Sequence, residues 1–256
     1  VTASWHRLVP AMDTWLGLLQ DRLGLTSLDF IVSLNSHVVP VAWIASYPKQ
    51  AHEDKLLEWF VHSQVWSRFS RSSETALDAD LQRLHGVRSG NPFPGLMQGL
   101  RSGGQAARIT QGDLQTATRQ SSLRVLMYLA ARDSGARDLF TGEVIVGTTV
   151  ASGQQAVMQQ IFPSTATRRQ VPVREANELT NYVLLAQEVR ATKPTADVFR
   201  YLPDVPRARL DDAAIPADPA LWEPARFRDF IRERRRHLAA QMNDALKALA
   251  GDAPAG

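Results

Sequence analysis

Cysteine is absent from the 256-residue sequence, which excludes disulfide bonds and metal sites built from thiolates. Histidine is sparse, since the six histidines are scattered and no pair has the spacing of metal ligands such as HExxH. Neither sign of charge dominates, because 29 Lys and Arg stand against 26 Asp and Glu. We therefore expect neither a disulfide-stapled scaffold nor a histidine-based metal enzyme, and we predict no metal-binding residue.

Long apolar runs and common enzyme motifs are missing too. The longest apolar run, His37–Tyr47, is about half of the roughly 20 residues that a membrane-spanning helix needs, and it contains Pro40. No secretory signal, phosphate-binding loop, Gly-rich dinucleotide turn or GxSxG turn occurs. We expect a cytoplasmic protein with no membrane partner. An apolar content of 44% in a chain of this length predicts a sizeable buried core.

Apolar residues in the first half recur with the spacing of helices. One face of the first predicted helix, which Gly24 ends, carries Trp5, Leu8, Met12, Trp15, Leu19 and Leu23. Further helices are predicted within 53–69, 70–86 and 121–135, and Thr75 with Asp78 resembles a capping box at the start of the second. The Gly-, Pro- and Ser-rich segment 87–104 predicts a long surface loop. Residues 1–145 are thus predicted to form a helical region.

The pattern changes after Gly142. The short apolar segments 143–150 and 156–162 predict two strands joined by a turn, and 180–187 predicts either a third strand or the start of a helix. A helix is predicted from Pro194, and a long one over residues 224–250. One face of that last helix carries Phe227, Ile231, Leu238, Met242, Ala245 and Leu249. We predict a second domain over 146–256 and a mainly α (α+β) chain.

Five blocks of sequence occur in the order that they have in one family. They read WSRFSRSSETALDADL, RDLFTGE, QQIFPSTATRR, ANELTNYVLL and AAIPADPALWEPARFRDFIRERRRHLAAQMN. In these blocks the chain resembles GmrSD-type restriction proteins, bacterial anti-phage proteins that pair a ParB-like nucleotide-hydrolysing domain with an HNH (ββα-metal) nuclease domain. The resemblance implies that 146–256 is an HNH-derived ββα module with phage DNA, modified DNA included, as its target. The nucleotide-hydrolysing domain lies upstream in the family and is not in this chain.

The resemblance places the nuclease motif on three residues. The family's His-His-Ile-Phe-Pro reads QQIFP here, so Gln160 stands where the general base belongs. An amide cannot accept a proton near neutral pH, and losing a positioned base costs about 10²–10⁴-fold in rate. Asn181 matches the asparagine that orients the base or the metal shell. The expected metal-ligand asparagine falls at about Arg190, whose guanidinium has no acceptor for Mg²⁺.

Each of these residues also has a plainer interpretation. Gln159 and Gln160 can be ordinary polar residues of a strand, Asn181 a cap or turn residue, and Arg190 a surface charge or a phosphate contact. Catalysis by a rearranged site with Mg²⁺ or Mn²⁺ stays open as well. The carboxylates that could contribute to such a site are those of Asp138, Glu143, Glu175 and Glu178.

Arginine is concentrated near the end of the chain. The segment RFRDFIRERRRH holds six arginines within eleven residues. The plain interpretation is a solvated face relieved by Asp229 and Glu233; the alternative is a ridge that contacts DNA phosphates without reading bases. The predicted DNA contacts are Arg168, Arg169, Arg174, Arg228, Arg232, Arg235 and Arg236. The segment 66–75 could bind phosphate at a helix start, but helix capping explains its Ser and Thr better.

Together these features predict the C-terminal, DNA-binding part of a GmrSD-like defence protein that is impaired as a nuclease. One alternative is an active metal-dependent nickase or endonuclease with a rearranged site. Another is a protein-interaction scaffold that makes no contact with nucleic acid. The sequence leaves the oligomeric state open.

Overall fold

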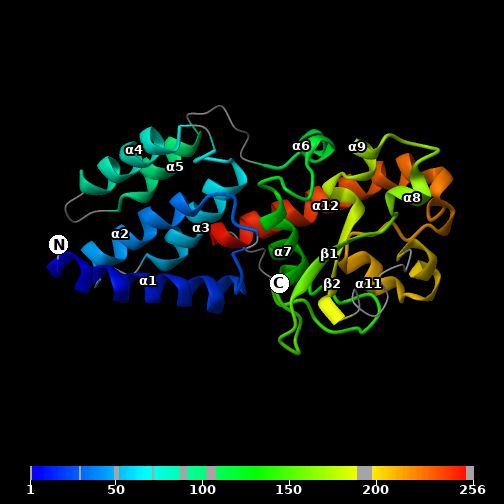
Figure 1. Ribbon diagram of the computed structural model, residues 1–256, viewed down its shortest axis with the longest axis horizontal. Helices are drawn as coiled ribbons and strands as arrows, with labels where there is room; N and C mark the ends of the chain where they lie inside the picture. Colours follow the sequence, from blue (N-terminus) through cyan, green and yellow to red (C-terminus); the bar gives the residue numbers. More distant parts are fainter. Residues whose placement is uncertain are drawn as a thin grey trace. The chain divides into compact units, whose positions relative to one another are not determined.

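The protein folds into two compact units in the computed structural model, which describes residues 2–28, 30–48, 52–70, 72–86, 91–101, 108–188 and 198–251 (Figure 1). The first unit comprises Val1–Ala107 with Leu246–Gly256, and the second Arg108–Ala245. The boundary expected near residue 145 therefore lies between residues 107 and 108. The chain is mainly helical with one small sheet, as predicted. No helix in the described ranges is long and apolar enough to cross a membrane.

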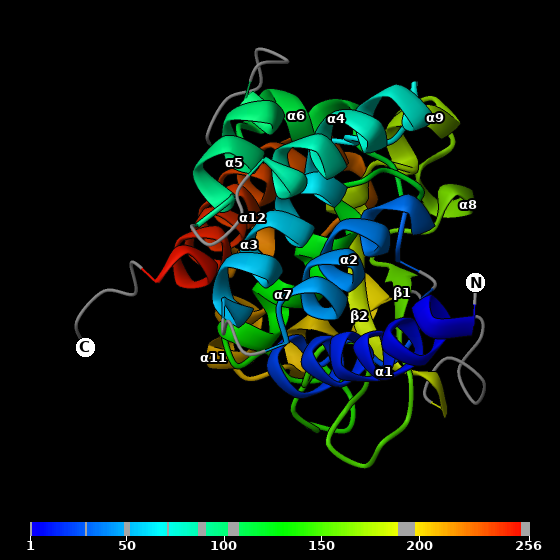
Figure 2. The same ribbon diagram turned by 90° about the vertical axis from the view of Figure 1, so that its left-hand side faces the viewer.

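The first unit is entirely helical where it is described (Figures 1 and 2). Its elements are α1 (Thr2–Leu23), η1 (Leu34–His37), α2 (Val38–Ser46), α3 (Glu53–Val65), α4 (Ser73–His85) and α5 (Phe93–Arg101). Its core includes Trp15, Trp43 and Trp59, each at most 1% exposed. Trp15 meets the ring of Phe60 edge-on at 5.1 Å between centroids, which joins α1 to α3.

A buried histidine links α1 to the start of α2. The indole Nε1 of Trp15 donates to Nδ1 of His37 at 2.9 Å, so the ring is held as the tautomer with its proton on Nε2. Burial lowers the pKa of His37, because a charged imidazolium would lose its hydration there. His37 is therefore a neutral core residue.

Two local expectations for this unit were wrong. Helix α4 begins at Ser73, two residues before Thr75, and its N-cap residue Ser72 makes no side-chain cap bond. The segment expected to be a loop over 87–104 contains α5, where Phe93 and Leu96 are buried. Apolar burial outweighed the turn-forming composition there, since tertiary packing overrides local propensity.

Arg68, in the segment 66–75 considered for phosphate binding or capping, has an internal partner. Arg68 binds Asp80 in a bidentate pair, with Nε–Oδ2 at 3.1 Å and Nη2–Oδ1 at 3.0 Å. Arg83 adds a third bond to the same carboxylate at 2.9 Å. Asp80 is 0% exposed. The carboxylate is thus stabilised by two guanidinium groups, and it fixes the turn after α3 against α4.

Asp80→Asn should destabilise the first unit by about 2–4 kcal/mol, because it leaves two guanidinium groups partly buried beside a neutral amide. Urea denaturation followed by tryptophan fluorescence measures this, since Trp15, Trp43 and Trp59 report on this core. The control is Asp78→Asn on the same helix, at an exposed position. Equal stability of the two variants would contradict a structural role for Asp80.

The second unit combines short helices and most of the long helix α12 with a two-stranded antiparallel sheet (Figure 1). Strand β1 (Ala156–Gln160) pairs with β2 (Tyr182–Ala186), with Ala156 opposite Ala186 and Gln160 opposite Tyr182. Around them lie α6 (Gln111–Thr116), α7 (Arg124–Asp133), α8 (Ser164–Thr167), α9 (Val173–Ala176), η2 (Leu179–Asn181), η3 (Val198–Asp204), α11 (Arg207–Asp212), η4 (Pro219–Leu221), η5 (Pro224–Arg226) and α12 (Phe227–Ala250).

Helices α6 and α7 belong with the sheet rather than with the helices before them. The hydroxyl of Tyr128 lies 3.4 Å from the carbonyl of Ala156, and the amide of Leu179 donates to the carbonyl of Ala117 at 2.8 Å. These contacts join residues far apart in the sequence. They place α6 and α7 in the second unit, so the boundary precedes α6. The sequence did not predict this boundary, because the periodicity of apolar residues carries no information on such long-range contacts.

The strand expected over 156–162 is confirmed as β1, and of the two alternatives for 180–187 the structure shows the strand, β2. The segment 143–150 forms isolated bridges in place of a strand, because the chain turns at Gly147 with φ of 118°. The bridges are Arg137 with Val144, Ile145 with Val150, and Thr149 with Gln155. The helix expected from Pro194 falls partly outside the described residues, and residues 198–204 form the 3₁₀ element η3. The long last helix is confirmed as α12.

Candidate nucleic-acid interface

Gln160 holds a short helix in place. Its side-chain Nε2 donates to the carbonyl of Ala176 at 3.1 Å and to Oδ1 of Asn177 at 2.9 Å. Both amide protons are therefore used to hold the C-terminal end of α9. A side chain in this arrangement neither accepts a proton nor points free into solvent. Gln160, which stands at the position of the expected base, therefore has a structural role.

Tyr182, opposite Gln160, offers no substitute base. Burial raises the pKa of its phenol, an effect that the charge of Arg119 and a hydrogen bond with Gln160 oppose. The phenol is accordingly protonated at neutral pH and can act only as a hydrogen-bonding group.

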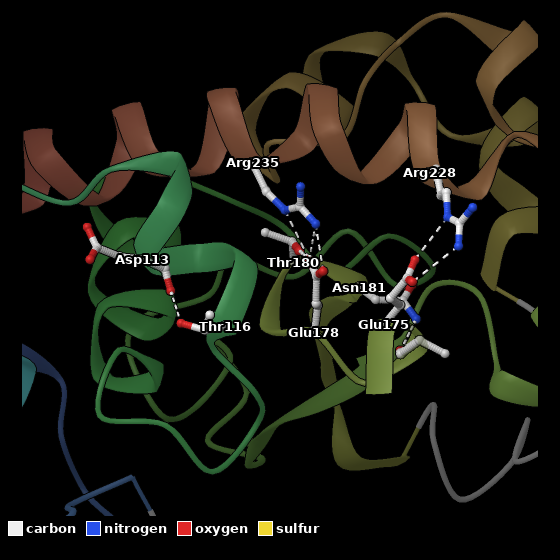
Figure 3. A network of polar contacts seen from close by, with 9 residues as sticks. Asp113, Thr116, Glu175, Glu178, Thr180, Asn181, Arg228 and Arg235 are labelled. Carbon is white, nitrogen blue, oxygen red and sulfur yellow. Dashed lines mark hydrogen bonds and ion pairs between the residues drawn. The ribbon is translucent and has the colours of Figure 1, made fainter. Parts of the chain in front are cut away.

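Asn181, which Figure 3 labels, connects three segments of the unit through its hydrogen bonds. Its Oδ1 accepts from the amide of Phe162 at 3.0 Å, while Nδ2 donates to the carbonyls of Phe162 and Ala176, both at 2.7 Å. The side chain is completely buried. Gln160 and Asn181 therefore meet on the Ala176 carbonyl, so the structure brings together two of the three motif positions. Arg190, the third position, lies outside the described residues.

The carboxylates that could rebuild a nuclease site have other partners. Asp138 is buried and accepts from the amides of Phe140, Thr141 and Ala186, which ties its loop to the end of β2. Glu143 receives a bond from the hydroxyl of Thr141 at 3.4 Å. The described part of the chain contains no group of three or more His, Asp or Glu that could hold a metal ion.

A groove of about 830 Å³ opens between α6, α9 and α12. Four arginines, two glutamates and apolar or neutral side chains line it: Gln115, Thr116, Pro172, Arg174, Glu175, Glu178, Phe227, Arg228, Ile231, Arg232 and Arg235. Its four arginines all belong to the predicted DNA contacts. Helix α6 contributes Gln115 and Thr116, which sequence reasoning missed because it assigned this segment to another domain. The available signal was a capping box, Thr110 with Asp113, which starts α6.

The buried pair in this groove is Arg235 with Glu178 (Figure 3). Arg235 places Nε 3.0 Å from Oε2 and Nη2 2.6 Å from Oε1, and Thr180 donates its hydroxyl to Oε2 at 3.0 Å. The two side chains are only 18% and 7% exposed. This pair joins α12 to the strand-connecting segment, so Arg235 is held within the protein.

The other groove arginines are open to solvent. Arg228 binds Glu175 through Nε–Oε2 at 3.0 Å and Nη2–Oε1 at 3.2 Å, with the arginine side chain 65% exposed (Figure 3). Arg232 bonds to Asp229, its neighbour on α12. Arg174 is exposed, and no ion pair is observed for it in the described structure. Exposed pairs of this kind contribute at most about 1 kcal/mol, so an incoming phosphate can replace the carboxylate.

The remaining predicted DNA contacts do not line the groove. Arg168 and Arg169 follow α8 and are exposed, and Arg236 pairs with Glu233 on the solvent side of α12. The arginines predicted to contact DNA therefore differ in their exposure, in their ion pairs and in whether they line the groove.

Arg234 is the one arginine of the run that turns inward. It is 1% exposed and donates to the carbonyls of Thr180 and Ala213. Burial lowers its pKa to about 9, since no carboxylate offsets the lost hydration. Its position three residues after Ile231 and four before Leu238 puts it on the buried face of α12, which the helical spacing could have indicated.

No protein family matches this sequence, and a comparison with curated proteins finds no significant relative.

Asn181→Ala should destabilise the second unit by about 3–5 kcal/mol, because it removes the hydrogen bonds of Asn181 to the buried amide and carbonyl of Phe162 and leaves the carbonyl of Ala176 with Gln160 alone. Native-state hydrogen exchange of the β1 and β2 amides measures the change. Gln159→Ala is the control, since the structure shows no side-chain hydrogen bond for that neighbouring amide. A loss below about 1 kcal/mol would contradict a structural role for Asn181.

Proposed function

We propose that the second unit binds the phosphate backbone of DNA in the groove between α6, α9 and α12, on an HNH-derived framework that no longer cuts. In this proposal the chain is the C-terminal part of a GmrSD-like bacterial defence protein directed at phage DNA, and it acts in the cytoplasm. The observation that carries the proposal is the groove itself, in which four arginines stand against two glutamates.

The charges of the groove support phosphate binding. Arg174, Arg228 and Arg232 are exposed on two sides of it, and their guanidinium groups suit bidentate contact with phosphate oxygens. Phosphate contacts of this kind provide affinity and orientation without reading the base sequence. Arg168 and Arg169 extend the positive surface beyond α8.

The loss of cutting is inferred from the partners of Gln160 and Asn181. Both side chains bind the Ala176 carbonyl, so they maintain the framework around the former site rather than activate water. Of the four candidate carboxylates, Glu175 and Glu178 are engaged with arginines and Asp138 is engaged with backbone amides. A framework kept intact without a base supports binding or regulation.

Arg174→Ala should weaken binding of a 20-base-pair duplex about 5-fold at low salt and make the slope of log K against log[salt] less negative by about 0.9. Fluorescence anisotropy over a salt series measures both quantities. Arg207→Ala is the matched control, an exposed arginine on α11 paired only with Asp211 at 3.7 Å. Failure to bind DNA even at low ionic strength would favour the interaction scaffold.

Supercoiled plasmid should stay uncut with Mg²⁺ or Mn²⁺ present, since Gln160, at the position of the expected base, carries an amide that cannot accept a proton. Agarose gels over several hours test this, with EDTA and the Glu175→Gln variant alongside. Metal-dependent nicking by the native chain that Glu175→Gln abolishes would establish the alternative, an active nickase with a rearranged site. Asn181→Ala is unsuitable for this purpose because it perturbs the fold.

A further inference from the structure

The apolar face of α1 extends beyond the core that covers it. Sequence spacing puts one apolar stripe along the whole helix, but only its second half is buried, at Trp15, Leu19 and Leu23. Toward the N-terminus Trp5 is 65% exposed, and the neighbouring side chains are between 39% and 43% exposed. These neighbours are Leu8, Val9, Met12 and Leu16.

The exposed residues form a seam of the kind that pairs helices. Trp5, Val9, Met12 and Leu16 follow one another at intervals of four, three and four residues, which is the a/d spacing of a coiled coil. Five large apolar side chains that are contiguous on one helix face mark an interaction surface rather than scattered surface residues.

The seam is complementary to itself. Its intervals read the same in both directions, so a second copy running antiparallel places Trp5 opposite Leu16 and Val9 opposite Met12. Such a twofold axis crosses the helix between residues 10 and 11, which is the centre of the exposed stretch. In a twofold-symmetric interface the same patch of both subunits must be complementary to itself, and the seam meets this requirement.

The polar edge of the seam fits the same arrangement. His6 and Asp13 lie along one edge of the stripe, seven residues apart and both exposed. Equivalent edges face each other in an antiparallel pair, which sets His6 of one copy near Asp13 of the other, twice over. An imidazole N–H can donate to a carboxylate. The antiparallel direction also opposes the two helix dipoles favourably.

We propose that α1 is a homodimerisation element, in which two copies of the chain pair their α1 helices antiparallel through Trp5, Leu8, Val9, Met12 and Leu16. The interface is short, because Leu19 and Leu23 are already buried in the first unit. We therefore expect weak pairing, with a dissociation constant on the order of 10–100 µM. Dimerisation of this kind sets two DNA grooves in one particle, yet it does not depend on the groove binding DNA.

Sedimentation velocity of the native chain from about 5 to 500 µM should show a reversible monomer–dimer equilibrium. Met12→Lys puts a charge at the centre of the seam and should raise the dissociation constant by at least about 50-fold. Thr14→Lys adds the same charge on the opposite, exposed side of α1 and should leave the constant unchanged. Circular dichroism of each variant checks that the fold is kept. A native chain that stays monomeric throughout, or equal weakening by both substitutions, overturns the proposal.

Direction is tested by disulfide trapping, which the absence of native cysteine makes specific. A mixture of Trp5→Cys and Leu16→Cys chains should form a mixed disulfide under mild oxidation. Leu16→Cys alone should not, because two such residues lie about 16 Å apart along an antiparallel pair. A Leu16→Cys homodisulfide without the mixed product would mean parallel pairing and overturn the antiparallel arrangement.

Discussion

The side chain of Asn181 makes the hydrogen bonds on which the second unit depends. It joins the chain after β1, through both backbone groups of Phe162, to the end of α9 at the Ala176 carbonyl. Gln160 reaches the same carbonyl from the end of β1. Because α9 forms one wall of the groove, these amides determine where Arg174 and Glu175 stand. A buried backbone carbonyl that is satisfied by two amides cannot shift without breaking both, which makes this wall rigid.

The arginines of α12 differ in burial and therefore in what they bind. Arg234 faces inward and supports the strand-connecting segment through backbone carbonyls, and Arg235 does so through Glu178. Arg228 and Arg232 keep exposed partners that solvent screens. Residues adjacent in sequence thus differ in whether their charge is available to a ligand. Fewer arginines are therefore available to DNA phosphates than the arginine run contains. In the proposal, the affinity for DNA depends on the exposed arginines of α9 and α12.

Much of the secondary structure was predictable because it follows from local periodicity. The helix of residues 2–23, strand β1 and the last helix were expected from spacing alone, whereas spacing left the segment of β2 open between a strand and the start of a helix. The expected boundary near 145 and the loop over 87–104 failed, since each depended on packing against distant residues. For the site, the resemblance assigned Gln160 and Asn181 to one nuclease motif, and the two side chains lie close together. Their common hydrogen-bond partner, the carbonyl of Ala176, could not be predicted from the sequence. The contribution of Gln115 and Thr116 to the groove was likewise hidden.

The sequence by itself determined which helix faces are apolar, where helices end at glycine, and that no thiolate chemistry is available. These properties depend only on residue type and spacing, which do not change with the tertiary contacts of a residue. Tertiary structure alone decided which apolar faces are buried and which charged side chains are buried or paired within the protein. Trp5 and Trp15 both belong to the apolar side of one helix, yet one is exposed and the other buried. Arg234 and Arg232 differ in the same way. Burial depends on what packs against a residue, and those partners come from distant parts of the chain.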